Sequence, residues 1–121
     1  AGKRLGPAEV ETAVVGHPQV VEAAAVGVPD ELKGEALWVF VVPARGVDTD
    51  DALRQSIAAT VVEALGPSFK PAQVRFTKAL PKTRSAKVLR RAIRSVVTGA
   101  APGDLSGLED PASLEAIATA S

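Results

Sequence analysis

The sequence predicts a small α+β domain, in which a mainly three-stranded sheet packs against flanking helices. Three observations support this fold class. The length of 121 residues fits one domain, and 46% hydrophobic and 23% charged residues are ordinary for a globular chain. Two strongly apolar segments follow each other near the middle of the chain. Segments with a helical period alternate with them, and Gly and Pro separate the segments. We therefore treat residues 1–121 as a single domain.

The first element is a helix over residues 8–15. Pro7 suits a first helical position, and Val10 and Val14 share one face of the helix. The sequence Gly-His-Pro at 16–18 ends the helix. The single histidine therefore has a terminating role in this interpretation, not a chemical one.

Two strands are expected next, over residues 20–28 and 35–42. The second is the clearer strand because it is rich in aromatic and β-branched residues and Pro43 ends it. A loop over 30–34 joins them, so the pair is predicted to form an antiparallel hairpin.

The second half of the chain begins with a helix over 50–65, where Leu53, Ile57 and Val61 follow at steps of four. A short strand within 71–78 and a second long helix over 85–97 come next. Residues 99–121 are predicted to form a loosely ordered tail that contains one short helix.

The composition excludes several kinds of site. There is no Cys, so disulfides, thiolate metal sites and Cys nucleophiles are excluded. One His cannot form a multi-histidine metal site. No apolar run approaches the roughly 20 residues of a membrane span, and the first residues lack the apolar core of a signal peptide. We expect a domain that is soluble, does not bind a membrane and is located in the cytoplasm.

The cations are concentrated in one stretch, although 14 Lys and Arg balance 14 Asp and Glu. Residues 70–94 hold nine cations and no acidic residue. Such a block usually faces an anion or a polyanion. On the expected helix over 85–97, four of these cations fall within an arc of about 100°; they are Lys87, Arg90, Arg91 and Arg94. Like charges at this spacing repel, which favours a phosphate or an acidic partner over a merely solvated face.

A motif at residues 80–91 has the sequence Leu-Pro-Lys-Thr-Arg-Ser-Ala-Lys-Val-Leu-Arg-Arg. It resembles the final motif of the adenylate-forming acyl-CoA synthetases, whose usual form is Pro-Lys-Thr-Arg-Ser-Gly-Lys, two apolar residues and Arg-Arg. Residues 2–11 are similar to the segment after the interdomain hinge of that family, and residues 17–35 to a third segment. Residues 103–111 resemble the tail of its acetyl- and propionyl-CoA synthetase branch. The resemblance covers the whole chain in order.

The resemblance implies the C-terminal domain of an AMP-forming short-chain acyl-CoA synthetase, an acid–thiol ligase. Such an enzyme uses ATP, with Mg, to form an acyl-adenylate, and CoA to form the thioester. The domain would rotate between the two steps. Its first partner would be the N-terminal domain of the same synthetase, which this chain lacks together with the hinge residue. Alone, the chain is expected to be inactive and to bind none of these molecules tightly.

The resemblance also assigns roles to individual residues. Lys87 matches the lysine that stabilises charge in the adenylation step. Gly2 and Arg4 match the segment that faces CoA and AMP in the thioester step. The motif loop that positions the lysine consists of Pro81, Lys82, Thr83, Arg84 and Ser85.

The resemblance of the same motif also implies a regulatory role. In related enzymes the lysine is reversibly acylated by protein acetyltransferases and restored by deacylases, which implies Lys87 as an acylation site. Arg84, Arg90 and Arg91 would then serve recognition of an acidic partner surface.

Two positions depart from the family pattern. Ala86 replaces the usual Gly, which a negative φ would tolerate. Val62 stands where close acetyl-CoA synthetases carry an Arg near the CoA nucleotide, so this position does not supply a cation for the CoA 3′-phosphate.

Two other functions stay open. The domain could act by itself as a binding module and acetyltransferase substrate. A basic nucleic-acid-binding domain is disfavoured, because only four aromatic residues are available for stacking. Neither the acyl substrate nor the oligomeric state of the synthetase follows from this sequence.

Overall fold

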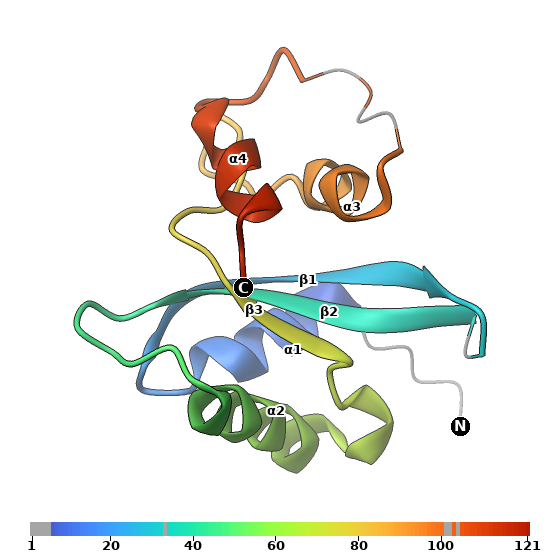
Figure 1. The fold of residues 1–121 in the computed structure, drawn as a ribbon, viewed down its shortest axis with the longest axis vertical. Helices are drawn as coiled ribbons and strands as arrows, with labels where there is room; N and C mark the ends of the chain where they lie inside the picture. Colours follow the sequence, from blue (N-terminus) through green and yellow to red (C-terminus); the bar gives the residue numbers. More distant parts are fainter. Residues whose placement is uncertain (1–5, 33, 101–102, 104) are drawn as a thin grey trace.

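The structure of the chain is a computed structural model, which describes residues 6–32, 34–100, 103 and 105–121. A three-stranded sheet with the order β1-β2-β3 separates two layers of helices. Helices α1 and α2 cover one face, and α3 and α4 cover the other (Figure 1). The bounds are α1 Pro7–Val15, β1 Val20–Asp30, β2 Gly34–Pro43, α2 Asp51–Leu65, the 3₁₀ helix η1 Pro67–Phe69, β3 Gln73–Phe76, α3 Arg90–Thr98 and α4 Ala112–Ala118. The predicted α+β fold class is confirmed.

The sheet is mixed. β1 and β2 form the predicted antiparallel hairpin, in which Val26 lies opposite Trp38. β3 pairs in parallel with β2, with Val74 opposite Val39, and α2 lies in the connection between them. A parallel pair needs such a crossover, because the chain must return to the end of the sheet where the first strand began.

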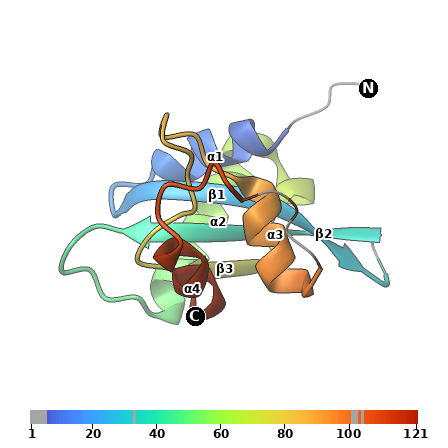
Figure 2. The ribbon, with the colours of Figure 1, turned by 90° about the horizontal axis from the view of Figure 1, so that it is seen from above.

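Both faces of the sheet are buried, which explains why the two long strands are almost continuously apolar. Successive side chains of a strand point to opposite faces. Ala25 and Val39 therefore join the cluster under α1 and α2, whereas Val26 and Phe40 join the cluster under α3 and α4. Seen from above, α3 and α4 lie over the second of these faces (Figure 2).

The ends of the first two helices follow from local chemistry. Gly6 precedes α1, and the Glu9 carboxylate accepts a hydrogen bond from the Gly6 N–H at 2.8 Å. The Asp50 carboxylate caps α2 by accepting the Leu53 N–H at 2.9 Å. Side-chain acceptors at these positions satisfy N–H groups that have no partner within the helix.

The helix predicted over 85–97 is wrong at its start: α3 begins at Arg90. The preceding residues form a hairpin, because Lys82 and Val88 pair in an antiparallel bridge. The hydroxyl groups of Thr83 and Ser85 bond to each other, and the Thr83 hydroxyl also accepts the Lys87 N–H, which competes with helix formation. Lys87 therefore lies outside the helix and does not share its basic face.

The described part of the C-terminal segment packs against the domain. Ile117 of α4 and Ala120 belong to the cluster under α3 and α4. The Ser121 N–H donates to the Phe76 carbonyl, and the Phe76 N–H donates to the Ser121 carbonyl, each at 3.2 Å. The loose order expected for 99–121 stays a prediction, and the burial of these two side chains argues against it.

Candidate functional site

The motif that the sequence analysis singled out forms a short hairpin. The Thr83 N–H donates to the Lys87 carbonyl, and the Ala86 N–H donates to the Thr83 carbonyl, both at 2.9 Å. The Thr83 hydroxyl lies 2.9 Å from the Ser85 hydroxyl and accepts the Lys87 N–H at 3.3 Å. Thr83 is thus the centre of the hydrogen bonding that shapes the loop.

Ala86 has a φ of 67°, and no other residue except glycine has a positive φ in the described part of the chain. A three-residue hairpin loop commonly ends on a residue in this left-handed region. A negative φ, the condition under which the sequence analysis would tolerate a methyl group at Ala86, is therefore not met. The family's glycine suits this position without strain, whereas the Ala86 methyl group does not.

The base of the hairpin is held from three sides. Pro81 is fully buried. The Lys82 ammonium forms an ion pair with Glu22 of β1. On the third side, Thr83 pairs with Leu108, and the Glu109 N–H donates to the Lys82 carbonyl at 2.9 Å.

Lys87 is exposed and directly follows the three-residue loop of this braced hairpin. Among the residues that the structure describes, none pairs with its ammonium group. The side chain is therefore available to an anion that approaches from outside the domain.

The three arginines assigned to partner recognition have different surroundings. Arg84 and Arg91 are exposed. The Arg90 guanidinium is half-buried and forms two hydrogen bonds with Glu11 of α1, from Nε to Oε2 at 2.8 Å and from Nη2 to Oε1 at 2.5 Å. This hydrogen bonding raises the pKa of Arg90 above its ordinary value despite partial burial, so the group stays charged in the physiological range. Since Nε and Nη2 of Arg90 both bind Glu11, Arg90 is a structural residue in this arrangement.

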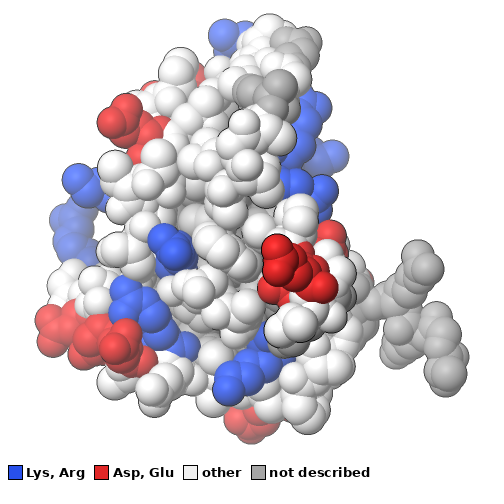
Figure 3. Space-filling model, turned by 45° about the vertical axis from the view of Figure 1, so that its right-hand side comes forward, with Lys and Arg blue, Asp and Glu red and all other residues white. Residues whose placement is uncertain are grey.

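The face drawn in Figure 3 carries charged side chains of both signs. On the face drawn in Figure 3, Lys and Arg side chains alternate with Asp and Glu side chains. The acidic residues that interrupt them come from parts of the chain outside 70–94. Folding brings two of the cations of 70–94 beside acidic residues from outside that stretch, Lys82 beside Glu22 and Arg90 beside Glu11.

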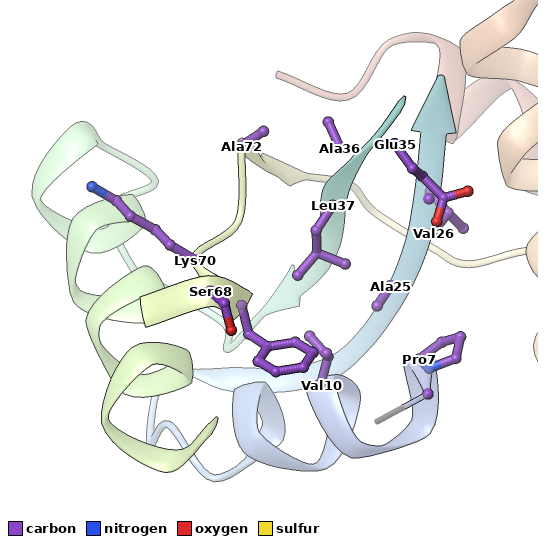
Figure 4. A pocket seen from close by; sticks show the side chains of 13 residues that line it. Pro7, Val10, Ala25, Val26, Glu35, Ala36, Leu37, Ser68, Lys70 and Ala72 are labelled. Atoms are coloured by element: carbon purple, nitrogen blue, oxygen red, sulfur yellow. The ribbon is translucent and has the colours of Figure 1, made fainter. Parts of the chain in front are cut away.

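A cavity of about 270 Å³ opens on the side of the sheet that α1 covers. Its lining includes Gly6, Val10 and Gly27. Leu37 and Val10 point into it, and Glu35 and Lys70 lie at opposite rims (Figure 4). The sequence analysis missed this cavity; the glycine within β1 was the one available signal, because glycine in a strand often marks a close approach.

Gly2 and Arg4, the residues predicted to face CoA and AMP, lie outside the described residues. Val62 is half-buried on α2. In the described ranges there is no group of three or more His, Asp or Glu side chains that could hold a metal ion. No helix in those ranges is long and apolar enough to cross a membrane.

Glu11 and Glu22 were also missed. Each holds the motif from far away in the sequence, Glu11 through Arg90 and Glu22 through Lys82. No local pattern marks them, because an acidic residue in a first helix or an edge strand is ordinary on a protein surface.

The chain resembles known proteins over most of its length. Residues 9–87 match the model of the AMP-binding enzyme C-terminal domain. The acetyl-coenzyme A synthetase of Pyrobaculum aerophilum is 49% identical over 115 residues, which are 95% of this chain and 17% of that protein. The 3-hydroxypropionyl-coenzyme A synthetase of Metallosphaera sedula is 45% identical over 97% of this chain and 18% of that protein.

The chain is also similar to parts of solved structures. An acyl-CoA synthetase from Brucella canis superposes with a TM-score of 0.77 at 39% identity, over 81% of this chain and 18% of its own. An amide bond synthetase from Marinactinospora thermotolerans has a TM-score of 0.68 at 35% identity, over 75% of this chain and 18% of its own. The chain thus spans less than a fifth of the length of each of these four proteins.

Proposed function

We propose, because this chain belongs to the AMP-binding enzyme C-terminal domain family, that it is the mobile C-terminal domain of an AMP-forming short-chain acyl-CoA synthetase. The observation that carries the proposal is the exposed Lys87, which directly follows the loop of a hairpin whose base is braced on three sides. The names of the two synthetases favour a short acyl group. The rest of the synthetase, an N-terminal domain, would supply the carboxylate pocket and most of the ATP site.

Lys87 would act in the first half-reaction. A carboxylate oxygen attacks the α-phosphorus of ATP, and the bond to the pyrophosphate oxygen breaks. Negative charge builds on the oxygens around phosphorus in the transition state, and a positioned ammonium stabilises it. A long, compact cation suits this role because it reaches between two oxygens without a fixed fork. Pro81, Lys82, Thr83 and Ser85 would hold the loop from which Lys87 extends.

CoA would enter from the other side of the domain. In the second half-reaction its thiol attacks the acyl carbon of the adenylate and AMP leaves. Gly2 and Arg4 precede Gly6, which lines the cavity under β1 and β2. The hairpin of Lys87 packs on the α3 and α4 side of the sheet through Leu80 and Val88. Two faces on opposite sides of one sheet fit a domain that rotates between two steps.

The proposal is tested in the complete synthetase that contains this sequence. Lys87→Ala should lower pyrophosphate release with short carboxylates by about 10²–10³, the usual effect of removing one transition-state donor. Thioester formation from supplied acyl-adenylate should continue. The matched control is Lys78→Ala, another exposed lysine, which should leave both steps unchanged. Normal pyrophosphate release by Lys87→Ala would refute the assignment.

The cofactors follow from the same proposal. ATP and CoA would be bound between this domain and the rest of the synthetase. Any Mg²⁺ that accompanies ATP would be held by the nucleotide and by the N-terminal part. A cytoplasmic location stays a prediction that cell fractionation would test.

Regulatory acylation of Lys87 is a second role that the exposure of this side chain favours. A protein acetyltransferase would neutralise the ammonium and block adenylation, and a deacylase would restore it. The role of Arg90 in partner recognition is the weaker part of this proposal, because Glu11 occupies its guanidinium. The test therefore changes Arg84 and Arg91 to Glu and leaves Arg90 in place. Unchanged acetylation of that variant would exclude recognition through these arginines.

The two alternative functions, a binding module and a nucleic-acid-binding domain, predict different outcomes in these experiments. A mere binding module would lose partner affinity in Lys87→Ala but would have no adenylation to lose. A nucleic-acid-binding domain would bind any duplex with an affinity that falls steeply with salt, because phosphate contacts release counterions.

A further inference from the structure

Glu11 connects three elements that are distant in the sequence. It lies on α1, and its side chain is 15% exposed. Its Oε2 accepts the Ala25 N–H of β1 at 2.8 Å and the Arg90 Nε–H of α3 at 2.8 Å, while Oε1 accepts Arg90 Nη2 at 2.5 Å. One carboxylate therefore links a helix below the sheet, the edge of the sheet and a helix above it.

The location of this link has a physical reason. β1 is an edge strand, because the order of the sheet is β1-β2-β3. Alternate N–H groups of an edge strand point away from the sheet and have no strand to pair with. Glu11 satisfies one of them at Ala25, which fixes the carboxylate against the edge. The carboxylate is then already in place to receive Arg90.

Arg90 is close to the Lys87 hairpin in the chain. Val88 forms the last bridge of the hairpin, and the Leu89 N–H donates to the Pro81 carbonyl at 2.9 Å. Arg90 begins α3 immediately afterwards. A two-point contact between Arg and a carboxylate fixes direction as well as distance. The pair therefore sets where the hairpin leaves the body of the domain.

We propose that Glu11 is a positioning residue for Lys87, acting through Arg90 across the edge of the sheet. This inference rests on the proposed function, because it concerns the adenylation step. The ion pair of Lys82 with Glu22 holds the other strand of the hairpin to the same edge strand. The two pairs together prevent the lysine from swinging away from the body of the domain.

The test uses Glu11→Gln in the complete synthetase. The amide oxygen of the glutamine can still accept the Ala25 N–H, so this N–H of the edge strand keeps its hydrogen bond. The negative charge and the two-point contact with Arg90 are lost. A misplacement of about 1 Å can cost about 10² in rate. We expect the adenylation kcat to fall about 10-fold to 100-fold, with the KM for ATP and the thioester step from supplied adenylate changed less than about twofold.

Three controls separate positioning from simple destabilisation. Ile57→Val removes one methyl group from the core cluster under α1 and α2, where Ile57 is fully buried. It should lower Tm without slowing adenylation more than thioester formation. Glu63→Gln and Arg45→Gln remove exposed charges of the same kinds and should change neither step. Arg90→Gln should match Glu11→Gln, and the double variant should be no worse than the more severe single one.

The outcomes are distinct. A selective loss of adenylation with non-additive variants supports the proposal. Equal losses in both steps, or a loss of the kind expected for Ile57→Val, would show that the pair only stabilises the fold and would overturn the proposal. If Lys87→Ala itself adenylates normally, the proposed function fails first. If Lys87→Ala loses adenylation while Glu11→Gln does not, only the positioning role fails.

Discussion

Replacing Ala86 by glycine should stabilise this domain, which is the reverse of the usual effect of that substitution. Ala86 has a φ of 67°. The left-handed region costs an L-residue about 1–2 kcal/mol, because Cβ approaches the carbonyl oxygen that follows. Glycine does not have this cost, but its freer unfolded chain costs about 0.5–1 kcal/mol. Taken at their midpoints, the two costs leave a net gain of about 0.75 kcal/mol.

Urea and thermal unfolding of the 121-residue chain measure the effect. The gain corresponds to about 2–5 °C in Tm for a domain of this length. Ala100→Gly is the matched control, because Ala100 is exposed and does not have a positive φ. That substitution should be neutral or destabilising. A branched side chain makes the strain worse, so Ala86→Val should lower the free energy of unfolding. If Ala86→Gly destabilised the chain as much as the control, the left-handed conformation of the loop would be refuted.

The remaining predictions concern the core, the cavity and the C-terminal end. Ile93→Ala should lower the free energy of unfolding by about 2–5 kcal/mol, because the Ile93 side chain is fully buried between α3 and the sheet; a loss below about 1 kcal/mol would contradict the packing. In Gly27→Ala the new methyl group would lie 2.2 Å from the Glu35 Cδ atom. The exposed Glu35 side chain can rotate away, so the free energy of unfolding should change little, while the thioester step should slow if CoA passes the cavity; an unchanged thioester step would place CoA elsewhere. In hydrogen exchange, the amides of Phe76 and Ser121 should be protected, because each donates to the other residue; exchange of the Ser121 amide at the rate of a free chain would support the loosely ordered tail.

Local sequence predicted most elements correctly. The helix and strand positions up to Phe76 follow from the period of the apolar residues and from Gly and Pro at their ends. The hairpin of β1 and β2 follows from a short loop between two apolar segments. The helix expected over 85–97 was wrong at its first turn, because periodicity cannot distinguish a helical turn from a hairpin that is held by contacts with distant residues.

The roles assigned to the residues of the candidate site stay predictions, and the contacts that support its loop were not predicted. Lys87 is exposed, as a residue that meets a ligand must be. Its separation from the helical arginines appeared only in the structure, because it depends on the hairpin that the Lys82–Val88 bridge closes. The sequence also suggested four cations on one helical face, whereas Arg90 is bound to Glu11.

The sequence by itself therefore determined the elements, the motif and the family, because each depends on residues that are near one another in the chain. The tertiary structure alone decided the parallel pairing of β3, the left-handed Ala86, the cavity under the sheet and the carboxylates that hold the hairpin. The physical reason is the distance along the chain between the residues that interact. Periodicity, caps and turns act over a few residues, whereas a partner such as Glu11 is 79 residues from Arg90 and becomes its neighbour only when the sheet edge brings them together.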